Sequence, residues 1–383
     1  MKKFLTALML LAAVSCSPAA DDQSARQGWE DMFKPVETPT EESSDPGDSY
    51  DPESGERWFK MIGIICCWTD VAIRSKLDYI DIAKRTGINT FSIYNCDKES
   101  ATWKSYTAEC ARNGIDIEFE EHMLGWLLPR DLYNKGMDSD GTNFNDYYRM
   151  NDHGVRINDY NGCPSCPAAL DTIRKRAMII GERYRSTNNK YYCWLDDTGD
   201  ICHCPKCKDL NPADQALTFE NVIIEGLRAV NPEATLAHLA YYNTVEAPKK
   251  VKPVEGIFLE FAPIDRDHFR PMSEASASGK DARTHGQYLK ALADNLKVFP
   301  VETAQVLDYW LDCSLFSGWD ETNLKQVPWN QALFEDDVKT YASYGIRNIT
   351  TYTSYISANY VKKFGYPDCI DKYATYLRDF VKK

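Results

Sequence analysis

Runs of apolar residues alternate with amphipathic stretches along the chain after residue 56. The first run, residues 60–68, reads KMIGIICCW and shows no regular polar alternation. A continuous apolar run of this kind is typical of a strand buried on both faces of a parallel sheet. Seven further runs share this character and predict strands at residues 90–94, 115–121, 191–196, 234–242, 256–262, 304–311 and 346–352.

A helix-like stretch is expected after each predicted strand. The clearest stretches predict helices before Gly87 and Asn113 and at residues 168–184, 213–230, 286–297, 331–344 and 369–381. Regular strand–helix order implies parallel strands with right-handed crossovers. Eight such units predict an α/β fold of the (β/α)8 TIM barrel type, forming a single catalytic domain over residues 57–383. A doubly wound open sheet is the alternative, but the count of eight and the lack of a Gly-rich first turn favour the barrel.

The first 15 residues have the features of an export signal. Lys2 and Lys3 precede a short apolar run, Phe4–Val14, which cannot span a bilayer. Small residues then lead to Cys16, so residues 1–15 resemble a bacterial lipoprotein signal peptide. We expect Cys16 to be lipidated, which predicts an outer-membrane lipoprotein facing the cell surface or the periplasm. An ordinary cleaved signal with an incidental cysteine is the alternative.

Residues 16–56 predict an acidic disordered tether. Twelve Asp and Glu residues stand against Arg26 and Lys34, so this segment carries −10 of the chain's formal charge of −13. So few large apolar residues interrupt it that it cannot bury enough surface to offset the entropy of ordering. The remainder is only mildly acidic and lacks the basic excess that nucleic-acid binding demands. We therefore expect no binding to nucleic acid. Separately, we expect the protein to be a monomer.

Carboxylates and aromatic residues stand at the ends of the predicted strands. In an eightfold barrel these ends surround one mouth, where catalytic residues sit. Asp196 and Asp197 end the fourth strand, and residues 129–166 form a long irregular stretch of a kind that is usually functional. The other strand-end residues that we expect to bind substrate are Trp68, His122, Tyr241, Glu260, Trp310 and Asp312. Paired carboxylates beside aromatic platforms predict glycoside chemistry.

Several of these residues have a structural alternative. His122, Tyr241 and Trp310 could simply pack, and Glu260 could pair with Arg266. The sequence contains no GxGxxG turn, P-loop, G-x-S-x-G elbow or HExxH helix. We therefore expect catalysis without a cofactor.

Five cysteines gather in two loops, as Cys163-x-x-Cys166 and Cys202-x-Cys204-x-x-Cys207. C-x-x-C pairs are typical of structural zinc, and four of the five could make one tetrahedral site. The twelve cysteines beyond Cys16 also permit disulfides in an exported protein, and free thiols are the third alternative. Whether zinc or a disulfide joins them, we expect the cluster to pin the two loops.

Four segments together resemble a known family. They are residues 121–129 (EHMLGWLLP), 196–207 (DDTGDICHCPKC), 239–244 (LAYYNT) and 261–266 (FAPIDR). The set resembles DUF4838, a family related to glycoside hydrolase family 163, whose members are endo-β-N-acetylglucosaminidases acting on N-glycans. The resemblance spans residues 115–320. Asp196 stands where the family has Asn, and Glu121 stands where it has Gly. We also expect this protein to lack the N-terminal accessory domain of larger members.

The resemblance implies a glycoside hydrolase for glycans that contain N-acetylhexosamine. By this interpretation Asp196 orients the 2-acetamido group of the substrate as it attacks the anomeric carbon, with net retention. Asp197 protonates the leaving oxygen and later activates water, while Tyr241 donates to the developing oxazoline. One alternative is double displacement on another glycan, with Asp308 or Asp312 as nucleophile. The other is a non-catalytic glycan-binding lipoprotein on a degenerate barrel.

Overall fold

The computed structural model describes residues 57–381 apart from 97, 160, 198 and 199. All its strands run parallel: β1 (Met61–Cys67), β2 (Thr90–Tyr94), β3 (Asp116–Glu118), β4 (Glu120–His122), β5 (Lys190–Trp194), β6 (Thr235–Ala240), β7 (Ile257–Phe261), β8 (Gln305–Asp308) and β9 (Asn348–Tyr352). The predicted lipidation site Cys16, the predicted signal peptide and the predicted tether lie outside the described residues.

The strands close into a barrel through one interrupted strand. Their order is β3-β2-β1-β9-β8-β7-β6-β5-β4, and β3 and β4 are separated in sequence by Phe119 alone. Residues 116–118 pair with β2, whereas residues 120–122 pair with β5. The two halves therefore act as the third strand of an eightfold barrel, and the predicted (β/α)8 fold is confirmed.

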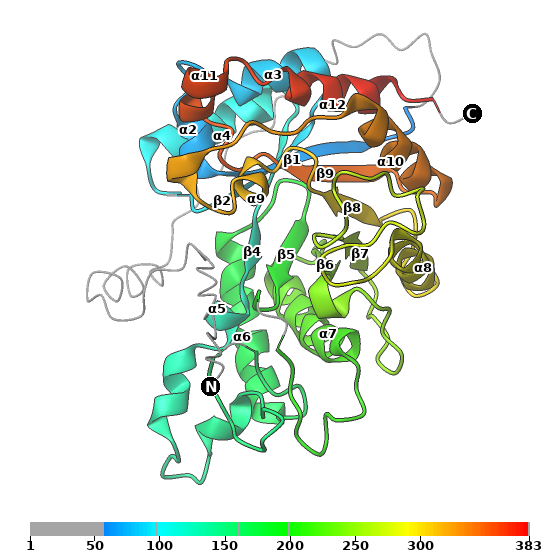
Figure 1. Ribbon diagram of the computed structural model, residues 1–383. Coiled ribbons are helices and arrows are strands. Elements are labelled where there is room, and N and C mark those ends of the chain that lie inside the picture. Colours follow the sequence, from blue (N-terminus) through cyan, green and yellow to red (C-terminus); the bar gives the residue numbers. More distant parts are fainter. Residues whose placement is uncertain (1–56, 97, 160, 198–199, 382–383) are drawn as a thin grey trace, which may run out of the picture.

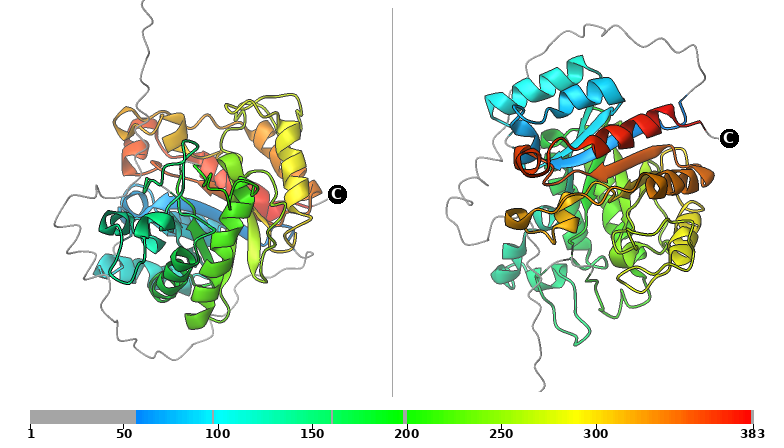
Figure 2. Two further views of the ribbon diagram at one scale, coloured as in Figure 1. Left: turned by 90° about the horizontal axis from the view of Figure 1, so that it is seen from below. Right: turned by 45° about the horizontal axis from the view of Figure 1, so that its top comes forward.

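Helices cover the outside of this sheet (Figures 1 and 2). They are α2 (Trp68–Ala72), α3 (Tyr79–Thr86), α4 (Ala101–Arg112), α5 (Leu124–Leu127), α6 (Pro167–Arg183), α7 (Pro212–Val230), α8 (His285–Asn295), α9 (Cys313–Phe316), α10 (Gln331–Ser343), α11 (Ala358–Phe364) and α12 (Asp368–Asp379). Among the described helices, none combines the length and the apolar character needed to cross a bilayer.

The expectation of a helix after every strand is wrong for β6. The connection to β7 opens with a short 3-10 turn, Tyr242–Thr244, and then runs without regular structure through Pro248 and Pro253. Proline lacks the amide hydrogen that a helix interior needs. The buried carboxylate of Asp214 in α7 accepts from the amides of residues 249, 250 and 251 at 2.8, 2.7 and 2.8 Å. A side chain thus satisfies donors that a helix would otherwise pair.

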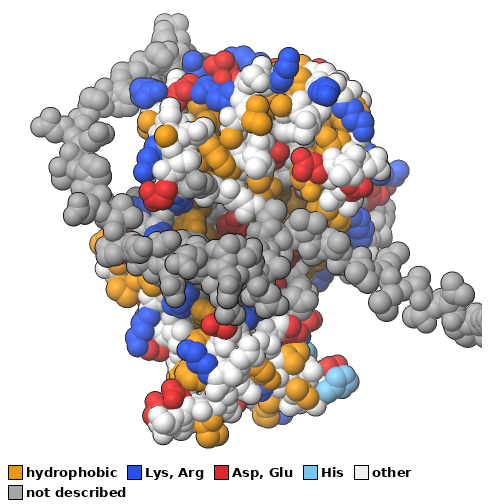
Figure 3. All heavy atoms as spheres, turned by 90° about the vertical axis from the view of Figure 1, so that its left-hand side faces the viewer, with side chains coloured by type: hydrophobic (Ala, Val, Ile, Leu, Met, Phe, Trp, Pro, Cys, Tyr) orange, Lys and Arg blue, Asp and Glu red, His pale blue; other side chains and the backbone are white. Residues whose placement is uncertain are grey.

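The long stretch predicted as irregular, residues 129–166, is irregular in the structure. It contains two 3-10 segments, Arg130–Lys135 and Phe144–Tyr147, and projects from the lower end of the barrel in Figure 1. Over the face in Figure 3, Lys and Arg side chains are interspersed with Asp and Glu.

Strand alternation divides the core into two parts. Tyr192, Trp194, Phe258, Leu307 and Tyr309 pack together inside the barrel. The larger cluster lies between the strands and the helices, and it takes in Cys193, Leu259 and Phe261 from the alternate positions. Successive side chains on a strand point to opposite faces, so the position of a residue along its strand decides whether it lines the barrel or faces a helix.

Candidate active site

The two carboxylates that follow β5 bind different partners. Asp196 accepts a hydrogen bond from Arg130 Nη2, and its backbone amide donates to Asn161 Oδ1 at 3.0 Å. Asp197 accepts a 2.9 Å hydrogen bond from the Tyr241 hydroxyl. The side chains of these adjacent residues can point in different directions because the strand ends at Trp194 and the chain then turns away from the sheet.

The carboxylates also differ in exposure. The Asp197 side chain is 44% exposed, and the Asp196 side chain only 17%. Burial raises the pKa of Asp196, while the nearby Arg130 and His122 partly oppose this shift. Asp197 is therefore the carboxylate open to a reactant, and Asp196 is held beneath it by Arg130 and Asn161.

His122 ends β4 and faces the carboxylate pair. Its Nδ1 donates to the Leu195 carbonyl, which leaves Nε2 directed at Asp197 Oδ1, 3.5 Å away. The ring lies 5.2 Å from the Trp194 ring and 6.4 Å from the Tyr241 ring, measured between centroids. Three neighbouring strands, β4, β5 and β6, thus bring His122, Asp197 and Tyr241 together.

Tyr241 is placed by a distorted turn after β6. The next residue, Tyr242, has φ of 44°, in the left-handed region that costs energy for a bulky residue. The two tyrosine rings pack with centroids 4.2 Å apart. Burial raises the pKa of Tyr241 well above its ordinary value, so its hydroxyl keeps its proton and acts as a donor.

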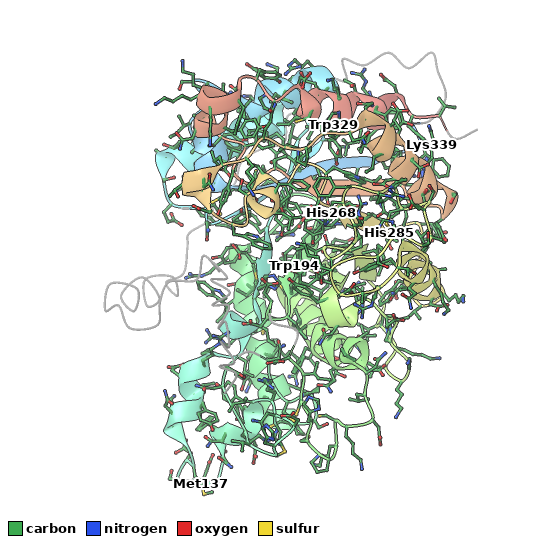
Figure 4. All side chains as sticks on the ribbon, in the orientation of Figure 1. Met137, Trp194, His268, His285, Trp329 and Lys339 are labelled. Carbon is green, nitrogen blue, oxygen red and sulfur yellow. The ribbon has the colours of Figure 1, made fainter. Side chains whose placement is uncertain are left out.

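A small cavity of about 30 Å³ lies beside these groups. Its lining includes His122, Asn161, Asp196, Tyr241 and Tyr242. This volume holds about one water molecule, so a sugar ring would have to bind over the mouth. A much larger groove of about 1140 Å³ lies between α10 and α12 and is lined by residues such as Trp329 and Lys339. Figure 4 shows both residues well away from Trp194, so the groove is separate from the carboxylate pair.

Other residues predicted to bind substrate have structural partners instead. Trp68 packs edge-on against Trp103 and Tyr106 of α4, with ring centroids 5.1 and 5.4 Å away. The Trp310 indole donates to Asp337 Oδ2 at 2.8 Å on the outer side of the barrel. Packing, the alternative stated for Trp310, thus describes that ring, and Trp68 also packs against neighbouring rings.

Asp312 is 4% exposed and caps the short helix α9. Its carboxylate accepts from Ser314 Oγ at 2.5 Å and from the Leu315 amide at 3.1 Å. Burial raises the pKa of Asp312 to about 6. Asp312 therefore has a structural role as the cap of α9.

Glu260 lies inside the barrel. It is fully buried and accepts from Trp194 Nε1 at 2.9 Å and from Gln305 Nε2 at 2.7 Å. Burial raises the pKa of Glu260 to about 8. The alternative in which Glu260 pairs with Arg266 is wrong, because Arg266 pairs with Asp308 and Asp337 instead.

Arg266 binds two buried carboxylates on the outside of the barrel. Its Nε lies 3.0 Å from Asp308 Oδ1, and its Nη2 lies 2.8 Å from Asp337 Oδ2. Asp308 also accepts from the Tyr341 hydroxyl at 2.7 Å. Asp308 is therefore enclosed in an ion-pair network and is not available as the nucleophile of a double displacement.

Two residues of the site had no sequence signal. Arg130 and Asn161 both come from the irregular stretch between β4 and α6, where no periodicity indicates which side chains turn toward the mouth. The length of that stretch was the one sign that it carries function.

Four of the five clustered cysteines come together. The sulfurs of Cys163, Cys202, Cys204 and Cys207 all lie within 4.8 Å of one another and are buried, while Cys166 borders the group. All twelve cysteines of the described residues are free, so the structure has no disulfide among them. The cluster lies between the loops that follow β4 and β5.

Comparison with known proteins gives one family and several distant structures. A search of curated proteins finds no match. A family 20 β-N-acetylglucosaminidase aligns with a TM-score of 0.48 and 9% identity, covering 84% of this chain and 70% of that one. A family 5 glycoside hydrolase from Prevotella bryantii B14 aligns with a TM-score of 0.46 and 11% identity, covering 87% of this chain and 100% of that one. A family 5 endoglucanase from Bacteroides salanitronis aligns with a TM-score of 0.44 and 11% identity, covering 86% of this chain and 97% of that one.

The family is assigned by a sequence model rather than by these structures. The model that matches is described as a domain of unknown function, DUF4838. Its match extends over residues 71–364 and includes every strand from β2 to β9 together with the carboxylate pair. The chain therefore belongs to the DUF4838 family.

Proposed function

We propose that the protein is a glycoside hydrolase that cleaves β-linked N-acetylhexosamine with help from the substrate's own acetamide. Asp197 acts as the general acid and then as the general base. Asp196 orients the acetamide, and Tyr241 donates to the acetamide oxygen as it attacks the anomeric carbon. The observation that carries the proposal is the divergence of two adjacent carboxylates toward different partners at one barrel mouth.

The exposure of Asp197 fits an acid that must reach a leaving oxygen. Its carboxylate has one hydroxyl donor, Tyr241, and a facing imidazole, His122. General acids and bases must lie within hydrogen-bond reach of the group that they protonate. A sugar over the mouth would meet this carboxylate first, because Asp196 lies deeper.

The ion pair of Asp196 with Arg130 does not bar a role in substrate orientation. The Arg130 side chain is 45% exposed, so the guanidinium has solvent into which it can move when a substrate binds. An acetamide N–H can then take the place of the guanidinium as the donor to the Asp196 carboxylate. Asp196 also retains its backbone link to Asn161 when this exchange occurs.

Double displacement has weaker support. Asp308 is engaged by Arg266 and Tyr341, and Asp312 caps α9. Both carboxylates thus already have protein partners, whereas a retaining mechanism of this type needs a free nucleophile about 5–5.5 Å from the acid. The substrate's acetamide supplies a nucleophile without the need for a second carboxylate.

We further propose that Cys16 is lipidated and anchors the enzyme in the outer membrane through the acidic tether of residues 16–56. The basis is the sequence of the first residues alone. Metabolic labelling with a fatty-acid analogue tests this part, since Cys16→Ser would abolish the label while leaving the barrel unchanged.

The catalytic proposal is tested by turnover of β-N-acetylglucosaminides and released N-glycans. Asp197→Asn keeps the shape and a hydrogen-bond acceptor but removes proton transfer, so kcat should fall about 10²- to 10⁴-fold. Asp196→Asn loses only charge assistance, and we expect a loss of about tenfold. Asp209→Asn, an exposed position in the same loop, serves as the matched control. Glycan binding without turnover by the wild type, unchanged in Asp197→Asn, would instead identify a non-catalytic binding protein.

A further inference from the structure

Four cysteine sulfurs lie at the spacing of a metal tetrahedron. Cys163 Sγ lies 3.8 Å from Cys204 Sγ and 3.9 Å from Cys207 Sγ. Zinc–sulfur bonds of about 2.3 Å place the sulfurs of a tetrahedral site about 3.8 Å apart. A disulfide needs about 2.05 Å between its sulfurs and can join only two at a time. The observed spacing therefore fits four ligands around one ion.

The surroundings of the sulfurs suit thiolates. The Met150 amide donates to Cys202 Sγ at 3.3 Å, and Arg156 Nη1 lies 3.6 Å from the same atom. Ser165 Oγ lies 3.0 Å from Cys207 Sγ. Donors and a guanidinium around the sulfurs stabilise the negative charge of a four-thiolate metal site, as outer-shell groups do in structural zinc centres.

We propose that Cys163, Cys202, Cys204 and Cys207 form a structural zinc site and that Cys166 is not a ligand. Each thiol releases its proton to solvent as it binds the ion. A set of four soft sulfur ligands selects zinc over magnesium or calcium. With four protein ligands the ion has no open position, so it does not take part in the reaction.

The site would fix the wall of the candidate active site. Cys163 belongs to the stretch after β4, and the other three ligands belong to the loop after β5. Close to the cluster, Asn161 Nδ2 donates to the Asp200 carbonyl at 2.7 Å, and Asn161 Oδ1 accepts from the Asp196 amide. Arg149 Nη2 also pairs with Asp200 at 2.9 Å. Zinc would thus join the two loops whose contacts hold Asp196.

Cys202 shows how the rest of the fold prepares this site. Its amide donates to Gln215 Oε1 at 2.9 Å, and Gln215 Nε2 donates back to the Cys202 carbonyl at 2.9 Å. Gln215 lies in the first turns of α7 and is 2% exposed. The Cys207 amide in turn bonds to the Cys204 carbonyl at 2.8 Å, which makes a tight turn between two ligands.

The test is the metal content of the full chain, purified without chelators or metal-affinity resins and measured by mass spectrometry. We expect one zinc per chain in the wild type and in Cys166→Ser, and a loss of at least tenfold in Cys207→Ser. The free thiols of the denatured chain are counted with and without reductant, and a higher count with reductant shows that cysteines were joined in disulfides. No zinc together with thiols that appear only after reduction would overturn the proposal, as would full zinc in Cys207→Ser or its loss in Cys166→Ser.

A second measurement does not depend on whether a variant folds. Wild-type protein is stripped by a chelator under reducing conditions and then refilled with Co²⁺. Tetrahedral thiolate ligation gives intense sulfur-to-cobalt charge-transfer and visible bands, and zinc should displace them. A weak octahedral spectrum would refute the site. Neither measurement uses glycan turnover, so its outcome is separate from that of the proposed activity.

Discussion

Replacing Arg266 with Met would leave the carboxylates of Asp308 and Asp337 buried without their guanidinium partner. All three side chains have no exposure to solvent, and the two ion-pair distances are 3.0 and 2.8 Å. Breaking a buried ion pair by removing one partner costs about 3–5 kcal/mol, because an uncompensated charge stays in the interior. We expect a loss of this size in the free energy of unfolding at pH 7.5.

The loss should depend on pH in a defined direction. Burial raises the pKa of Asp337 to about 6 even with Arg266 present. Without the guanidinium, the folded-state pKa rises further above the unfolded value. A carboxyl whose pKa is raised in the folded state favours folding only while it is protonated. This contribution is present at low pH and is lost as the pH rises through the folded-state pKa. The deficit of Arg266→Met relative to wild type should therefore be small near pH 5 and grow toward pH 8.

Urea denaturation followed by tryptophan fluorescence at several pH values measures this deficit. Arg270→Met is the matched control, since Arg270 is exposed and pairs with Glu274 four residues along the chain. It should leave the free energy of unfolding almost unchanged. A deficit below about 1 kcal/mol for Arg266→Met, or one that is constant between pH 5 and 8, would refute the buried network as its cause.

Three further predictions follow from single contacts. Tyr241→Phe removes the donor to Asp197 and should lower kcat about 10- to 100-fold, whereas Tyr242→Phe should leave kcat almost unchanged. Equal losses of kcat in the two variants would contradict the role of the Tyr241 hydroxyl as a donor. Glu260→Gln should flatten the pH dependence of the urea midpoint, because the raised pKa of Glu260 makes the wild type lose stability from about pH 4.5 to pH 8. Asp312→Ala should cost about 1 kcal/mol through the lost cap of α9 with kcat maintained; a large fall in kcat at unchanged stability would point to a role in catalysis.

The sequence predicts most of this fold because strands buried on both faces appear as continuous apolar runs. Strand β2 coincides with the predicted residues 90–94, and α7 begins within one residue of its predicted start. The connection after β6 was mispredicted since its amides are satisfied by Asp214, a residue 35 positions earlier. A contact over that distance leaves no periodic signal.

The candidate site was predicted only in part, for a geometric reason. Standing at a strand end places a residue near the mouth but does not say which way its side chain points. Leu307 and Tyr309 point into the barrel, so Asp308 between them and Trp310 after them point outward toward α10. Alternation applied to β8 would have predicted this. The positions of Arg130 and Asn161 were beyond such reasoning, because irregular backbone has no fixed period.

We propose that the acetamide of the substrate takes part in catalysis at the Asp196–Asp197 pair. The most direct measurement compares kcat/KM of the wild-type enzyme for a β-N-acetylglucosaminide and for the matching β-glucoside, which differs only at the 2-position. An intramolecular nucleophile supplies a large effective concentration, so the acetamido substrate should react at least about 100-fold faster. Equal rates for the two substrates, or a faster reaction with the glucoside, would contradict the account.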